Sequence, residues 1–223
     1  MDFETEEQQL EAIKNWWKEN STMIIGGIAV GVAAIFGVNY FQSQSAIRSE
    51  NASILYEQVL IGAQNPETTA DLISTQLAKV NQLEAEFSDT PYATLSALIV
   101  ARQHMNAGEV AKAEKQYQWV IDNTRQEEMK YLAKIRLARL LSGNKEADRA
   151  LAILTEAYPE SFSAMVLELK GDVLLSQGHR DRAKAAYTQA QLLSSKPGRW
   201  LKLKLDDLGG VAKQVAGATE PSA

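Results

Sequence analysis

The feature that most constrains this chain is an apolar run from Met23 to Phe41, which contains neither a charged residue nor a proline. A helix rises about 1.5 Å per residue, so the run extends roughly 28 Å, close to the hydrocarbon thickness of a bilayer. Its Ile, Val and Phe side chains favour membrane insertion by roughly 3 to 5 kcal/mol. Trp16, Trp17 and Tyr40 place amphipathic rings near both headgroup layers. The run therefore predicts a transmembrane helix, since nothing else in the chain is apolar enough to surround it as a buried core helix.

The residues that flank the run predict its orientation. Lys14, Lys18 and the amino terminus precede it, whereas Arg48 alone is the basic residue near its other end. Basic residues concentrate on the cytoplasmic side of a membrane span. A cleaved signal peptide is the alternative, because the small residues at 43–45 resemble a cleavage site, but residues 1–22 are acidic and the run is too long for one. We therefore expect an uncleaved, single-pass anchor with a cytoplasmic N-terminus.

Small residues recur at a spacing of four within the predicted span. Gly27 and Gly31 have the G-x-x-x-G spacing, and Ala33 and Gly37 repeat it. This spacing lets a second helix approach closely, although glycine and alanine are also common on lipid-facing surfaces. Gly27 and Gly31 are the candidate residues for packing within the membrane.

The composition excludes several classes of function. A formal net charge of −5, without a basic patch that contains aromatic residues, argues against nucleic-acid binding. The chain has no cysteine, which excludes a disulfide framework, a thiolate metal site and a cysteine nucleophile. An exported domain of this composition must be stabilised by packing alone.

Beyond the span, apolar residues recur at helical spacing as far as about Leu208, and no strand pattern is found. Turn-forming residues interrupt the pattern at 65–66, 88–91, 106–109, 123–126, 143–145, 158–160, 177–179 and 194–198. The fold class is therefore all-α. The predicted organisation is a cytoplasmic segment at 1–22, a transmembrane helix at 23–41, an exported helical domain at 42–208 and a disordered tail at 209–223.

The helical pattern contains a repeated unit that is clearest between Lys170 and Ala190. A small residue, Gly171, precedes a turn glycine, Gly178, and a second helix carries the inward residues Ala183, Tyr187 and Ala190. Two antiparallel helices approach closely only where side chains are small, and an aromatic ring fills the space one turn further on. This unit resembles a tetratricopeptide repeat.

The same template fits twice upstream. The equivalent positions are Ala138, Lys145, Ala150, Leu154 and Ala157 in one unit, and Ala101, Gly108, Ala113, Tyr117 and Val120 in the other. Equivalent alanines lie 37 and 33 residues apart, close to the period of the repeat. Lys145 departs from the turn glycine, and three unrelated alanine-rich hairpins are the alternative. The sequence thus predicts an α-solenoid of about three repeats, with flanking helices and a capping helix from Trp200 to Leu208.

No arrangement of residues indicates catalysis. The two histidines, His104 and His179, have no ligand-like neighbours in the sequence, and no glycine-rich phosphate loop is present. The acidic pairs at 127–128 and 206–207 are typical of solvated faces or helix ends. We expect neither an enzyme nor a site for a metal or cofactor.

Three segments carry a further resemblance, namely Gln9 to Trp16 before the span, Ile135 to Leu140, and Leu169 to Gly178. With the anchor and the repeats, they resemble the ancillary Sec-translocon subunit family of the YfgM type, over about Glu6 to Leu208. The resemblance implies an inner-membrane protein of Gram-negative bacteria with a periplasmic repeat domain. It also implies work at the Sec translocon channel, beside a membrane-anchored periplasmic chaperone of the peptidyl-prolyl isomerase type.

Two classes of function remain open at this point. The first is a non-catalytic translocon subunit that links the channel to periplasmic chaperones and helps to pass on exported proteins. The second is a repeat scaffold of another envelope assembly, such as outer-membrane protein insertion. The expected partners are the channel, the chaperone and membrane lipid, and direct contact with unfolded exported proteins is left open.

The first helix of each repeat lines the concave face of such a solenoid, which makes it the candidate partner-binding surface. The predicted residues are Leu95, Leu98, Arg102, Met105, Leu132, Ile135, Arg139, Met165, Glu168, Asp172 and Leu175. Apolar residues with methionine suit adaptable capture of a peptide segment, and arginines suit its carboxylates or carbonyl groups. The alternative is that the arginines pair with Glu168 and Asp172, or with the incoming helices, and fill the face from within.

Overall fold

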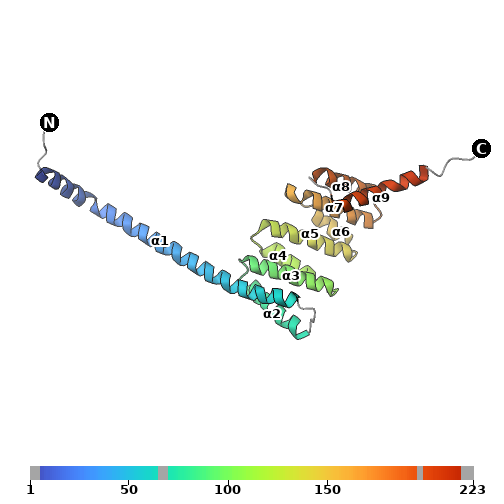
Figure 1. Ribbon diagram of the computed structural model, residues 1–223, viewed down its shortest axis with the longest axis horizontal. Coiled ribbons are helices and arrows are strands. Elements are labelled where there is room, and N and C mark those ends of the chain that lie inside the picture. Colours follow the sequence, from blue (N-terminus) through green and yellow to red (C-terminus); the bar gives the residue numbers. More distant parts are fainter. Residues whose placement is uncertain (1–5, 65–69, 195–197, 217–223) are drawn as a thin grey trace, which may run out of the picture. The chain divides into compact units, whose positions relative to one another are not determined.

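The computed structural model describes the backbone of residues 6–64, 70–194 and 198–216, and the side chains of 8–64, 74–194 and 198–209. Over these ranges the chain is entirely helical, as predicted (Figure 1). The helices are α1 (Glu6–Gln64), α2 (Ala70–Glu86), α3 (Pro91–Asn106), α4 (Val110–Asn123), α5 (Glu127–Gly143), α6 (Ala147–Leu154), α7 (Glu160–Ser176), α8 (Arg180–Leu193) and α9 (Arg199–Ala216). The chain divides into two units, residues 1–51 and 52–223.

Helix α1 contains the apolar run and is the one helix in the described ranges that is long and apolar enough to cross a membrane. None of its apolar window is buried by the rest of the chain, so it is not the core helix of the described fold. Helix α1 is continuous from Glu6 to Gln64, so it extends beyond both ends of the predicted span. No proline interrupts it, so its backbone hydrogen bonds continue across the predicted boundaries at residues 22 and 41.

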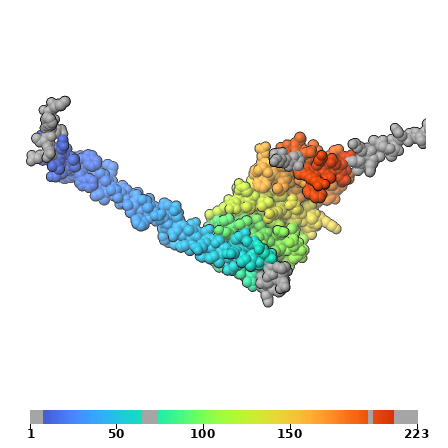
Figure 2. Space-filling model, in the orientation of Figure 1, coloured from blue at the N-terminus to red at the C-terminus, as the bar shows by residue number. Residues whose placement is uncertain are grey.

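The second unit is a stack of antiparallel helical hairpins. Helix α3 packs against α4, α5 against α6, and α7 against α8, while α4 contacts α5 and α6 contacts α7. Helix α2 adds to the first hairpin and α9 packs on the last. These helices form a continuous packed body in the space-filling view (Figure 2). The stack confirms the predicted solenoid of three repeats with flanking helices.

The three hairpin turns share one backbone geometry. Gly108, Lys145 and Gly178 occupy equivalent places and have positive φ angles of 73°, 67° and 81°. In each turn this residue donates its N–H to the carbonyl three residues back, and the next residue donates to the carbonyl five residues back. This is the Schellman arrangement, which satisfies the free carbonyls at a helix end. Lys145 therefore adopts the conformation that glycine provides in the other two turns.

The small residues of the template lie where the paired helices touch. Ala113, Ala150 and Ala183 are completely buried, as are Ala101 and Ala138. Gly171 is also buried, and a Cβ atom at this position would lie 2.4 Å from Cε1 of Tyr187. The Tyr187 hydroxyl donates to Asp172 at 2.7 Å, which holds the ring across the glycine. These contacts confirm the predicted repeat register.

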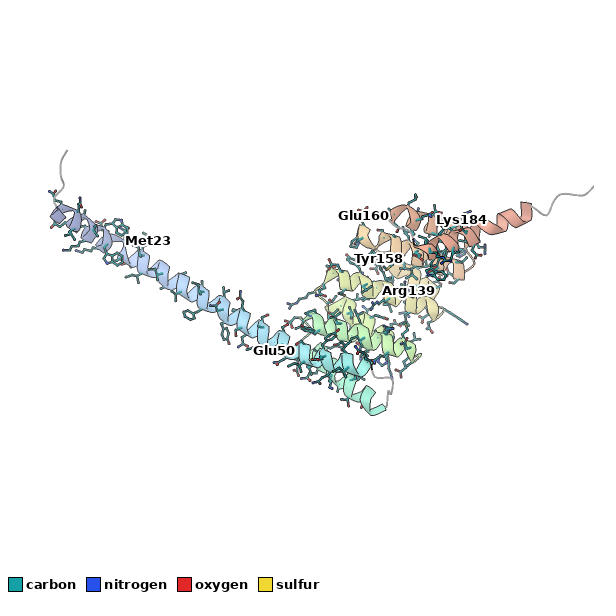
Figure 3. The ribbon with its side chains drawn as sticks, in the orientation of Figure 1. Met23, Glu50, Arg139, Tyr158, Glu160 and Lys184 are labelled. Carbon is teal, nitrogen blue, oxygen red and sulfur yellow. The ribbon has the colours of Figure 1, made fainter. Side chains whose placement is uncertain are left out.

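One template position was predicted wrongly. Ala157 was placed on the second helix of the middle unit, but α6 ends at Leu154 and Ala157 is exposed. Pro159 disfavours helical backbone at the residue before it, so the helix cannot continue through Tyr158. The Tyr158 ring instead lies 5.5 Å from that of Tyr131, between the hairpins (Figure 3).

Helix α9 covers the end of the stack, as predicted for a capping helix. Leu201 is buried in a cluster with Leu174 and Tyr187. The helix extends to Ala216, past the predicted boundary at Leu208. Residues 209–216 contain no proline, and glycine pairs weaken a helix without ending it. Residues 217–223 of the predicted tail lie outside the described ranges.

Candidate functional site

Six of the predicted partner-binding residues line a single groove between α3 and α5. The groove has a volume of about 540 Å³. It is lined by Leu95, Leu98, Arg102, Met105, Leu132 and Arg139 of the predicted set, together with Tyr56, Ile99, Tyr117, Met129 and Arg136. The structure therefore brings together six of the seven residues predicted for the first two repeats.

Helical spacing explains this convergence. On α3, residues 95, 98, 99, 102 and 105 recur every three or four positions, which puts them on one face. Residues 129, 132, 136 and 139 do the same on α5. Side chains from the two first helices thereby meet across one groove, with Tyr117 of α4 at its base, only 2% exposed.

Ile135 does not belong to this surface, although the sequence assigned it there. It is completely buried in the cluster that joins the first two hairpins. Successive helical residues are about 100° apart, so Ile135 points into the hairpin interface while Arg136 faces the groove. Leu98 belongs to both environments. It lines the groove but is only 6% exposed, because most of its side chain packs in the core.

Three arginines give the groove its charge. Arg102 and Arg139 are exposed and Arg136 is half-buried (Arg139 in Figure 3). None of the three has an acidic partner within the ranges that the structure describes, and no acidic residue lines the groove. Burial raises the pKa of the Tyr117 phenol, while Arg136, Arg139 and Arg102 act to lower it. The groove is thus apolar at its base and positive at its rim.

Three of the four predicted residues of the third repeat pack against α9 instead. Lys204 of α9 is 2.8 Å from Glu168 and 2.7 Å from Asp172, and Leu175 is half-buried against the same cluster as Leu201. The fourth, Met165, is 46% exposed and does not line the groove. The acidic pair is therefore bound by Lys204 and not by the arginines. This separates the third repeat from the groove of the first two.

Among the residues that the structure describes, the two glycines of the predicted membrane-packing face have open space beside them. A Cβ atom added at Gly27 or Gly31 would meet no neighbouring side chain or other segment within 4 Å. Packing of a second helix there stays a prediction.

The titratable groups form structural contacts. Nδ1 of His104 lies 2.6 Å from Glu109, which also contacts Lys112. Lys112, and then His104, lower the pKa of the Glu109 carboxyl by hydrogen bonding to it. His179 stands at the start of α8 and is exposed. In the described ranges, no group of three or more His, Cys, Asp or Glu side chains is arranged to hold a metal ion.

Some groove residues were not found from the sequence. Arg136 could have been found, because it follows Leu132 by four positions on the same helical face. Tyr56 could not, since it comes from a flanking helix whose docking position has no repeat pattern to indicate it. The contact of Lys204 with the third repeat, outside the groove, was missed for the same reason.

An apolar N-terminal helix followed by a tetratricopeptide-like solenoid defines this chain as a membrane-anchored repeat protein. The family described as "Tetratricopeptide repeat-like domain" matches residues 14–210. The "Ancillary SecYEG translocon subunit" of Escherichia coli (strain K12) is 30% identical over 185 residues, which cover 83% of this chain and 86% of that protein. The chain belongs to the family of ancillary SecYEG translocon subunits.

Further relatives support this assignment. The proteins of the same name from Haemophilus influenzae and Neisseria gonorrhoeae are each 28% identical, over 204 and 206 residues respectively. In both cases the match covers 91% of this chain and 97% of the relative. No solved structure matches the chain. The family as named is a non-catalytic kind of protein.

Proposed function

We propose that this protein is a non-catalytic ancillary subunit of the Sec translocon in the bacterial inner membrane. The observation that carries the proposal is the extent of the family match, which includes both the apolar helix and all three repeats. A relative that shared only the repeats would support no more than a common fold, because this repeat serves many functions. A match that continues through the anchor supports a shared location and a shared assembly.

The solenoid is the part that would reach other proteins. With the N-terminus in the cytoplasm, as the flanking lysines predict, the repeat domain lies in the periplasm. The open groove on α3 and α5 then faces the compartment in which exported chains emerge. In this proposal the repeat domain links the channel to a membrane-anchored chaperone of the peptidyl-prolyl isomerase type, so that exported proteins pass from the channel to the chaperone. An unfilled, mainly apolar surface supports this role.

Affinity purification of the intact, detergent-extracted protein tests the proposal. The channel should co-purify with it, and so should the chaperone. A matched control carries an unrelated single-span helix in place of residues 23–41, which separates recruitment by the anchor from recruitment by the repeats. Recovery of the outer-membrane insertion machinery, without the channel, would instead identify the protein as a scaffold of that assembly and refute the proposal.

A further inference from the structure

The groove on α3 and α5 has a positive rim, although the protein as a whole carries a net negative charge. The net charge of the chain is −5, yet Arg102, Arg136 and Arg139 converge where no acidic side chain lines the surface. Other basic residues of the described repeats form ion pairs, namely Lys112 with Glu109, Lys134 with Glu156, Arg149 with Glu114 and Glu146, and Lys204 with Glu168 and Asp172. Isolated basic residues such as Lys184 are in none of these pairs, so what distinguishes the three arginines is their convergence on one groove whose lining has no acidic side chain.

The rest of the lining is apolar and adaptable. Met105 is 40% exposed at one end of the groove, and Met129 is half-buried on the facing helix. Leu95, Ile99 and Leu132 are also half-buried, so each presents part of its surface to a ligand. Methionine side chains adjust to different shapes, which suits a surface that receives variable sequences. The volume of about 540 Å³ is in the range of sites that enclose a few side chains.

We propose that this groove binds an amphipathic peptide segment of another protein, in which carboxylate side chains flank an apolar stripe. The proposal rests on the proposed function and specifies the ligand of that site. The apolar stripe would cover the leucine and methionine side chains, while the planar guanidinium groups bind Asp or Glu carboxylates in pairs of parallel hydrogen bonds.

Charge complementarity favours this occupant over two others. A purely apolar segment would leave three arginines desolvated without partners, which costs free energy. An anionic lipid surface would satisfy the arginines, but it would not use the recessed apolar base formed by Leu98 and Tyr117. Lys204 supports the peptide further, because it offsets one of the two negative charges of Glu168 and Asp172 on the neighbouring repeat and so reduces their repulsion of an acidic ligand.

The test measures fluorescence anisotropy of a labelled peptide added to the full-length protein in neutral detergent. The peptide has about 15 residues, with leucines on one helical face and glutamates beside them. Three matched peptides carry glutamine for glutamate, lysine for glutamate, or serine for leucine. We expect the glutamate peptide to bind, and the glutamine peptide to bind on the order of tenfold more weakly, because charged hydrogen bonds are lost. Equal binding of these two peptides by the native protein would overturn the proposal.

Protein variants locate the site. Arg102→Gln and Arg139→Gln should each weaken binding of the glutamate peptide on the order of tenfold, with an unchanged thermal midpoint. Lys184→Gln on α8 is the matched control, since it removes one exposed positive charge, as the arginine variants do, at a position that does not line the groove (Figure 3). If the control weakens binding as much as the arginine variants do, binding depends on the overall charge of the protein, and a specific site in the groove is refuted.

Two further measurements distinguish peptide binding from lipid binding, and failure of the groove proposal from failure of the proposed function. The same variants are tested on nanodiscs that contain phosphatidylglycerol. If Arg102→Gln and Arg139→Gln lose binding to nanodiscs but not to the peptide, the arginines serve a lipid surface and the proposal fails. Co-purification of the channel is scored in parallel. If the channel co-purifies but the peptide does not bind, only the proposed groove ligand is refuted. If the channel does not co-purify with the native protein, the proposed function is refuted.

Discussion

At the scale of single residues, Gly171 leaves room for the Tyr187 ring, because a Cβ atom at this position would lie 2.4 Å from the ring. The glycine allows the Tyr187 ring to pass directly over the backbone of α7 and to reach Asp172. Burial raises the pKa of the Tyr187 phenol, and its hydrogen bond to Asp172 raises it further, so the hydroxyl stays protonated as a donor. One missing Cβ atom thus determines the position of the third hairpin.

Gly171→Ala should therefore destabilise the protein. The new Cβ atom would overlap the ring at 2.4 Å, and we expect a loss of about 1 to 3 kcal/mol in the free energy of unfolding. Urea titration followed by circular dichroism measures it. Gly143→Ala is the control, because a Cβ atom there meets nothing within 4 Å and the backbone is helical. Equal stability of the two variants would show that the ring does not lie over Gly171.

Glu84 is the residue whose charge opposes folding. Burial raises the pKa of its carboxyl, although Lys115 and Gln116 act in the opposite direction, and its Oε1 atom is buried without a hydrogen bond. A raised pKa means that the native state binds the proton more tightly than the unfolded state. Protonation of Glu84 therefore stabilises the native state. This contribution is absent at pH 7 and increases as the pH falls through the pKa of Glu84 in the folded protein.

Glu84→Gln should thus raise the thermal midpoint at pH 7. The gain over the native protein should shrink as the pH falls toward the ordinary glutamate pKa of about 4.3, because the native carboxyl is then neutral as well. Melting curves between these pH values measure the effect, with Glu57→Gln, an exposed site, as the control. A gain that is independent of pH would contradict the assignment to charge burial.

At the scale of elements, each repeat depends on its turn and on the contact between its two helices. The turn between α5 and α6 has Lys145 at a φ of 67°, where side chains other than glycine are strained. Its hydrogen bonds match those of the two glycine turns, so the geometry is imposed by the repeat and not by the residue. The middle repeat accepts local strain that the other two avoid.

Lys145→Gly should accordingly stabilise the protein, by about 0.5 to 1 kcal/mol, because glycine adopts this conformation without steric cost. Chemical denaturation of the full chain measures the difference. Lys145→Ala removes the same side chain but keeps the Cβ atom, so it should bring no gain. If alanine stabilises as much as glycine, removal of the lysine charge is the cause and backbone strain is not.

Close approach of α7 and α8 requires the small residue at Ala183, which is completely buried. Ala183→Leu should overpack this contact and lower the free energy of unfolding by about 1 to 3 kcal/mol. Ala185→Leu is the control on the same helix, since Ala185 is exposed. An unchanged thermal midpoint for Ala183→Leu would contradict the repeat register.

At the scale of the whole molecule, the apolar helix determines which compartment the repeats occupy. We expect the N-terminus to be cytoplasmic and the anchor to stay uncleaved, because the leader is acidic and the basic flanking residues precede the span. Protease added to spheroplasts should then digest the repeats and leave a membrane-protected fragment. A mature protein that begins at Ala46 would contradict this expectation.

The sequence by itself determined the all-α class, an apolar helix long enough to span a membrane, the three repeats and, apart from Ala157, their register. These features depend on local patterns, namely apolar periodicity, turn residues and small residues at fixed spacing, so they can be read without knowledge of tertiary contacts. The sequence also identified the helices that line the groove. It could not show that Ile135 is buried while Arg136 lines the groove. Which of two adjacent helical residues faces the groove depends on how the helix is rotated about its axis relative to its neighbours.

Only the tertiary structure decided which part of the predicted surface stays open. The first two repeats keep an exposed groove, whereas α9 docks on the third and places Lys204 between Glu168 and Asp172. The packing of the Tyr131 ring against those of Tyr158 and Phe162 likewise depends on the tertiary structure. The physical reason is common to both cases. The docking of a flanking helix or an aromatic ring depends on contacts between residues far apart in the chain, and no local pattern encodes them.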